Sequence, residues 1–134
     1  MIKPALSLSL LALVGALGGC AAMRGDVTEM PVFVLEEQPR GDVVEIASVT
    51  LVRPGYVVIH DRVDGEPGAV LGHSELLDPG THEDLSIALD SSGTGDAVVP
   101  MLHTDDGDGT YEFPGPDAPV MVEGRPVIAT LSWL

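Results

Sequence analysis

Glycine and proline interrupt this chain at short intervals, and these interruptions limit what it can fold into. The 134 residues include 16 glycines and 11 prolines, most of them in separators that read DGEPG, DPGT, DSSGTGD, DDGDG and FPGPDAP. After Met23, no stretch of about ten residues keeps an apolar stripe at helical spacing without a breaker. The sequence therefore predicts short strands rather than helices.

The runs between the separators have the periodicity of strands. Residues 47–51 alternate between apolar and polar side chains, the turn Arg53-Pro54-Gly55 follows, and residues 56–63 resume an extended pattern rich in β-branched side chains. We expect these two strands to pair as a hairpin. Further strands are predicted at residues 69–72, 83–89, 97–103, 110–113 and 127–133.

Several short strands separated by such turns are typical of an all-β sandwich or barrel. The predicted fold is all-β: a single Ig-like Greek-key β-sandwich of about seven short strands, preferred here to a closed barrel. Aliphatic residues are spread evenly through the chain, which does not fit a disordered protein. The sandwich is predicted to occupy residues 31–134, after a linker at residues 20–30 that lacks sustained periodicity.

The N-terminus, MIKPALSLSLLALVGALGGC, has the three-part layout of a secretory signal: one charge at Lys3, an apolar run over residues 5–17, and small residues before Cys20. Its ending, Leu17-Gly18-Gly19-Cys20, resembles the lipobox of bacterial lipoproteins. The resemblance implies removal of residues 1–19 and lipid on Cys20, hence an exported protein whose partner is a membrane. Since Ala21 follows, the lipid would hold it at the outer membrane of a double-membraned bacterium, on the periplasmic or surface side. The alternative is an ordinary signal in which the cysteine is incidental.

Removing that signal also removes the single lysine. The remaining 115 residues carry five arginines against 21 acidic residues, a net charge of −16. This charge argues against nucleic acid as a partner and leaves an envelope protein or a polysaccharide as candidates. Acid-rich surfaces without lysine suit a salty environment; a genome that encodes arginine in place of lysine is the alternative explanation.

Four motifs together resemble a domain of unknown function found in secreted and surface proteins of haloarchaea and in some bacterial lipoproteins. They are the GYVVIH strand, the GHS segment with a leucine three residues later, GTHED before a strand, and the acidic loop followed by EFPG. The resemblance covers residues 46–133. It implies a β-sandwich outside the cytoplasm and brings no established activity.

No catalytic residues are predicted. Gly72-His73-Ser74-Glu75-Leu76 is similar to a nucleophile elbow, but that motif needs glycine at its fifth position, where this chain has leucine. His82 and several aspartates could complete a triad only through geometry that a sequence does not give. The sequence therefore favours a non-catalytic module with a structural or binding role, lipid-anchored in the cell envelope, over an enzyme.

Metal binding is the alternative function, and copper is one version of it. Soft thioethers select Cu(I), and imidazole accepts either oxidation state. Met101 and His103 are two residues apart and would share one face of a strand. The other histidines are His60, His73 and His82. Isolated histidines on strands are more often surface or core residues, and a blue-copper site would also need a free thiolate.

Calcium is the other version, at the acidic loop HTDDGDGTYEF. An EF-hand is excluded, because with Gly109 at its sixth position the first position is Thr104 and the twelfth is Gly115. The sequence leaves two interpretations. The loop is a hairpin turn between strands 97–103 and 110–113, or it binds calcium weakly through Asp105, Asp106, Asp108 and Glu112. No other cofactor is predicted.

Overall fold

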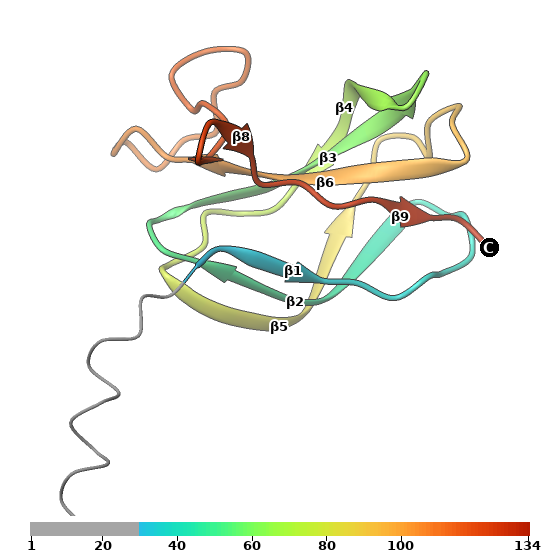
Figure 1. Ribbon diagram of the computed structural model, residues 1–134, viewed down its shortest axis with the longest axis horizontal. Helices are drawn as coiled ribbons and strands as arrows, with labels where there is room; N and C mark the ends of the chain where they lie inside the picture. The colour runs from blue at the N-terminus through green and yellow to red at the C-terminus, as the bar shows by residue number, and fades with distance from the viewer. Residues whose placement is uncertain (1–29) are drawn as a thin grey trace, which may run out of the picture.

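The computed structural model describes residues 30–134, and in this range the protein is an all-β sandwich without a helix (Figure 1), as predicted. Seven strands form two antiparallel sheets, and a two-stranded hairpin is added near the C-terminus. The strands are β1 (Val32–Val34), β2 (Val43–Leu51), β3 (Gly55–Val63), β4 (Glu66–His73), β5 (Gly80–Ala88), β6 (Ala97–Thr104), β7 (Met121–Val122), β8 (Arg125–Pro126) and β9 (Leu131–Ser132).

The two sheets interleave strands that are distant in the sequence. One sheet has the order β1-β2-β5 and the other β4-β3-β6-β9. The chain passes from one sheet to the other between β2 and β3, between β4 and β5, and between β5 and β6. Central pairs such as β2 with β5 and β3 with β6 therefore join non-consecutive strands, which is the Greek-key arrangement of Ig-like sandwiches.

The hairpin predicted from residues 47–51 and 56–63 is wrong. β2 pairs with β1 and β5, whereas β3 pairs with β4 and β6. Arg53-Pro54 therefore lies in a connection between the layers, and β2 faces β3 across the sandwich through side chains. A short proline–glycine turn fits a hairpin and also fits a connection between two sheets, so the local sequence could not distinguish the two arrangements.

β3 instead forms a hairpin with β4, the next strand along the chain. Its two-residue turn, Asp64-Gly65, has φ angles of 52° and 81°. Two consecutive positive φ values define the type I′ turn, whose twist matches that of antiparallel strands, and Asp-Gly is a preferred pair for it.

The core between the sheets is aliphatic. Side chains that alternate along each strand point into it, including Ile46 from β2, Ile59 from β3 and Leu102 from β6, all at most 1% exposed. The fully buried residues contributed by β3 and β6 to this inner core are Val57, Ile59, Val98 and Leu102.

β3 and β6 are buried on both faces. Nearly every residue of these strands is buried, whereas β5 shows exposed positions along its length. The cover on the outer face is the segment 105–130, which runs over the four-stranded sheet in the orange-to-red part of the chain (Figure 1). The runs YVVIH and AVVPML show this in the sequence, because a strand buried on both faces loses its polar alternation.

The predicted strand at residues 110–113 is wrong. These residues belong to a long loop, and the chain returns to β6 at Ala118, whose carbonyl accepts a hydrogen bond of 2.9 Å from the Thr104 amide. The predicted strand at 127–133 is confirmed only at β9. Tyr111 and Phe113 face the sheet with their side chains instead of pairing with it along the backbone.

The predicted signal peptide, Cys20 and nearly all of the 20–30 linker lie outside the described residues. Within residues 30–134, no helix is long and apolar enough to cross a membrane.

Candidate functional site

The outer face of the four-stranded sheet holds an unusual set of side chains. β3 and β6 pair so that Tyr56 lies opposite His103, Val58 opposite Met101, and His60 opposite Val99. These residues alternate with those of the inner core, so they point away from it. All six are buried, and His103 is 0% exposed.

Two aromatic rings from the covering segment close over this face. Phe113 meets His103 edge-on, with 4.5 Å between ring centroids, and His60 at 6.0 Å. Tyr111 lies 5.4 Å from Tyr56 and stacks on His73 at 3.9 Å. We call this set the outer-face cluster: Tyr56, His60, His73, Met101, His103, Tyr111 and Phe113.

The two buried histidines of the cluster make matching hydrogen bonds. His60 Nδ1 lies 2.9 Å from the carbonyl oxygen of Gly68, and His103 Nδ1 lies 2.8 Å from that of Asp117. Their rings are nearly parallel, with 5.8 Å between centroids. Burial lowers the pKa of His103, and the nearby His60 lowers it further, whereas the Asp117 carbonyl and carboxylate act in the opposite direction. His103 is therefore neutral at pH 7.

Met101 and His103, the two residues predicted for copper, differ in position from Met121 and His82. Met101 and His103 lie together on this buried face, as their spacing indicated, and the fold adds His60 from β3. Met121 is 55% exposed on β7, and His82 lies on β5 of the other sheet. His60 could not be assigned to the set from the sequence because its place depends on the pairing of β3 with β6.

The acidic residues predicted for calcium also come together, and the fold adds one that the sequence analysis missed. Carboxylate oxygens of Asp105, Asp106 and Asp117 lie within 4.8 Å of one another, as do those of Asp106, Asp108 and Glu112. Asp117 is fully buried. It follows a proline in the FPGPDAP separator, where nothing local distinguishes it from an ordinary turn residue.

These carboxylates organise the loop through its own backbone. Asp117 accepts hydrogen bonds from the amides of Asp106 and Glu112, at 2.9 and 2.6 Å. Asp105 accepts from the amides of Gly107 and Gly109. The carboxylates therefore satisfy amides that no strand pairs, a role that needs no metal.

The carboxylates also perturb one another. A hydrogen bond shared with Asp108 raises the pKa of Asp106 and that of Glu112, whereas the Thr110 amide lowers the pKa of Asp108. Calcium binding here stays a prediction. Calorimetric titration of the protein beside an Asp106→Asn, Asp108→Asn variant would test it, because heat from binding at this loop should appear only without the substitutions.

Tyr56 connects the loop to the outer-face cluster. Its hydroxyl donates to Asp105 Oδ1 over 3.2 Å. Burial raises the pKa of Tyr56 to about 12, with the charge of Asp105 adding to the effect. The phenol therefore stays protonated and fixes one end of the acidic loop to β3.

Ser74 and His73 have backbone partners rather than catalytic ones. Ser74 Oγ accepts a hydrogen bond from the Val57 amide and donates to the Glu75 carbonyl, at 2.9 and 2.8 Å. His73 Nδ1 lies 2.7 Å from the Ser74 carbonyl. His82 is bonded to the Asp78 carbonyl on the other sheet. Within residues 30–134, no imidazole is hydrogen-bonded to the Ser74 hydroxyl.

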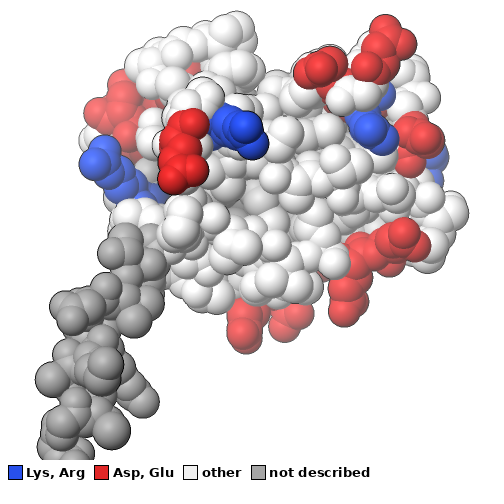
Figure 2. Space-filling view, in the orientation of Figure 1, with Lys and Arg blue, Asp and Glu red and all other residues white. Residues whose placement is uncertain are grey.

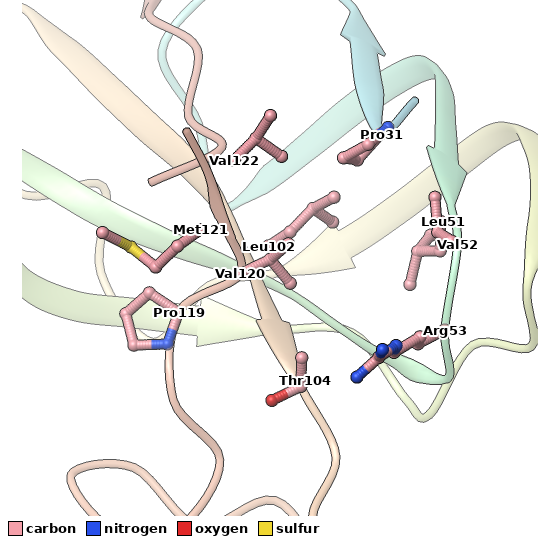
Figure 3. Close-up of a pocket in the computed structure, with 10 residues that line it drawn as sticks. All are labelled: Pro31, Leu51, Val52, Arg53, Leu102, Thr104, Pro119, Val120, Met121 and Val122. Atoms are coloured by element: carbon pink, nitrogen blue, oxygen red, sulfur yellow. The ribbon is translucent and has the colours of Figure 1, made fainter. Parts of the chain in front are cut away.

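An apolar groove of about 360 Å³ opens at one end of the sandwich (Figure 3). Its walls come from the residue before β1, the end of β2, the end of β6 and the approach to β7, which are far apart in the sequence, so the sequence does not reveal it. Residues that line it include Pro31, Leu51, Val52, Leu102, Val120 and Met121.

Comparison with known proteins places this fold in a family. A family model described as "Domain of unknown function (DUF7282)" matches residues 31–133. "Cell surface glycoprotein 1" of Haloarcula hispanica is 36% identical over 98 residues, which cover 72% of this chain and 10% of that protein. "Cell surface glycoprotein 2" of the same organism is 35% identical with the same coverage. The chain thus spans about a tenth of the length of these relatives. No solved structure matches it.

Proposed function

The chain belongs to the family described as Domain of unknown function (DUF7282), and on that premise we propose that it is a lipid-anchored, non-catalytic module of the cell envelope. Its similarity to two cell surface glycoproteins carries the proposal. The matched segment is a small part of each relative, so the likeness concerns one sandwich and not the whole surface protein. The family resemblance expected from the motifs is confirmed.

The anchor is assigned to Cys20. A single acyl chain holds a protein on a membrane only marginally, whereas the two or three chains of a mature lipoprotein hold it stably. Lipidation would also occupy the single cysteine, which an oxidising compartment would otherwise expose to unwanted disulfide formation. The linker at residues 20–30 would separate the sandwich from the bilayer.

The surface supports a structural or binding role. Figure 2 shows acidic side chains gathered toward the rim of one face, with a broad stretch free of charged side chains between them. An acidic surface is repelled by anionic lipid and nucleic acid, so the remaining candidates are an envelope protein or a polysaccharide. The backbone bonds of Ser74 and His73 support the non-catalytic part of the proposal.

Replacing Cys20 by serine tests the anchor. We expect the Cys20→Ser variant to leave the membrane fraction while its domain stays folded, because the lipid would be its attachment. An Ala22→Ser variant, which keeps the cysteine, should remain in the membrane pellet. If Cys20→Ser stays in the pellet after a high-salt wash, the lipid anchor is wrong.

Crosslinking in intact cells tests the binding role. We expect the anchored protein to capture an envelope protein or a polysaccharide that the Cys20→Ser variant, displaced from its membrane, captures less. Equal capture by both proteins would separate binding from anchoring and contradict a role that depends on the envelope.

A further inference from the structure

Three buried polar atoms of the outer-face cluster have no hydrogen-bond partner among the described residues: the Nε2 atoms of His60 and His103 and the Tyr111 hydroxyl. The Nε2 atoms of His60 and His103 are buried, and neither has a hydrogen bond to any described residue. The two side chains are 4% and 0% exposed. A buried polar atom left unsatisfied costs about 1–3 kcal/mol, so three on one face, two of them imidazole nitrogens, call for a physical explanation.

The hydrogen bond at Nδ1 of each ring determines the tautomer, and therefore whether Nε2 carries a proton. Each Nδ1 faces a backbone carbonyl, of Gly68 for His60 and of Asp117 for His103. A carbonyl oxygen only accepts, so each Nδ1 carries a proton, and a ring with that one proton presents a free lone pair at Nε2. Metal-binding histidines have this form, with the second nitrogen donating to a carbonyl or carboxylate.

The spacing of the rings suits one shared ion. With metal–nitrogen bonds of about 2.0–2.1 Å, two imidazoles on one ion have ring centroids about 5–6 Å apart. The observed separation is 5.8 Å. Met101 lies in the strand register between them, two residue pairs from each histidine and on the same face of the sheet, and its side chain is 6% exposed.

We propose that His60 Nε2, His103 Nε2 and the Met101 thioether form a buried site for Cu(I). Soft thioether and neutral imidazole ligands prefer this ion, whereas calcium and magnesium need oxygen ligands and structural zinc takes four nitrogen or sulfur ligands. No proton has to leave Nε2 when the metal binds. The site goes beyond the proposed envelope role and does not depend on the lipid anchor.

The neighbouring groups fit a single positive charge. The buried carboxylate of Asp117 belongs to the residue whose carbonyl holds His103, so negative charge is already present beside the site. Burying an ion costs less when an opposite charge accompanies it. Half-buried Phe113 meets both rings edge-on, so its loop is where an ion would enter.

Cu(I) titration against a chromogenic chelator, under anaerobic reducing conditions, tests the site. All samples should be the full chain with Cys20→Ser in detergent, so that no thiol competes. We expect one Cu(I) per protein. Met101→Leu keeps the volume and removes only the sulfur, and it should weaken binding by more than the 10–100-fold typical of losing an outer-shell partner. His60→Gln and His103→Gln should do the same.

The chain supplies matched controls. Met121→Leu removes an exposed thioether and His82→Gln an imidazole of the other sheet, and both should leave the affinity unchanged. X-ray absorption should show two imidazole nitrogens and one sulfur on the copper. The proposal is overturned if no Cu(I) binds, if Met101→Leu and Met121→Leu behave alike, or if Zn(II) binds more tightly. In the first case a water between the two Nε2 atoms would be the remaining explanation.

Discussion

The two faces of β3 and β6 need different kinds of neighbouring groups. The inner face contributes Val57, Ile59, Val98 and Leu102, which pack against the other sheet and have no polar side-chain atoms. The outer face carries Tyr56, His60, Met101 and His103 under a single loop segment. An aliphatic face needs only filled volume, whereas a face with histidine and tyrosine needs hydrogen-bond partners at defined places.

This difference indicates that the inner face contributes mainly to folding stability and that the outer face is the candidate for function. Any aliphatic set of the right volume would hold the two sheets together. The outer face instead depends on the Asp117 carbonyl for His103, the Gly68 carbonyl for His60 and the Asp105 carboxylate for Tyr56. The outer face is therefore the better place to look for function, and the inner face for stability.

The largest expected effect comes from breaking the inner face. Ile59→Ala should lower the free energy of unfolding by about 2–5 kcal/mol, because it leaves a cavity between the sheets. Urea unfolding measures this loss, and Val63→Ala, at the exposed end of β3, serves as the control. A loss below about 1 kcal/mol would mean that the two sheets are not packed as tightly as the burial of Ile59 indicates.

Removing the charge that orders the covering loop should have the next largest effect. Asp117→Asn replaces one acceptor oxygen by a donor group and leaves the Asp106 or Glu112 amide without a partner. We expect a loss of about 1–3 kcal/mol in urea unfolding. Asp96→Asn, an exposed carboxylate, should change little, and equal effects from both would show that the loop does not depend on Asp117.

Salt should stabilise the whole molecule by a smaller amount. The net charge is −15 on the whole chain and would be −16 without the predicted signal, and these charges repel one another over about 10 Å at 0.1 M salt but over only about 3 Å at 1 M. The melting temperature should therefore rise between about 0.05 and 1 M NaCl, by about 4–8 °C for each kcal/mol of repulsion relieved. A flat or falling melting temperature would show that the acidic groups are too well paired or too dispersed to repel.

The smallest effect should come from titrating the outer face. Because burial lowers the pKa of His103, the unfolded chain takes up a proton there at a higher pH than the folded one. Its contribution to stability is thus complete above the unfolded value of about 6.5 and falls as the pH drops through that value toward the folded pKa. The groups that face His103 are His60, Phe113 and Asp117.

Urea unfolding at about pH 7.5 and about pH 5.5 measures this dependence. The free energy of unfolding should be lower at the acid end, and His103→Gln should remove part of that difference, whereas His82→Gln should keep it. The same pH dependence in wild type and His103→Gln would exclude His103 as its source.

Local pattern was sufficient for the fold class and for most strand positions. Six of the predicted runs overlap observed strands, because alternation and turn residues act over a few neighbours. The strand prediction at residues 110–113 failed for the same reason. Tyr111 and Phe113 alternate with polar residues as in a strand, but their two rings cover the outer face of a sheet. That Met101 and His103 share one face of a strand was predictable from their spacing alone, whereas the arrival of His60 on that face was not.

By itself, then, the sequence determined an acidic, all-β chain whose first 20 residues resemble a lipoprotein signal, since charge, periodicity and composition are properties of short stretches. The tertiary structure alone decided that β3 pairs with β6 rather than with β2, and that residues 105–130 close over their outer face. Alternation says which side chains share a face but not which strand lies beside them, because strand pairing is settled by packing across the whole sandwich. His60 meets His103, and Asp117 joins the acidic loop, only after that packing is complete.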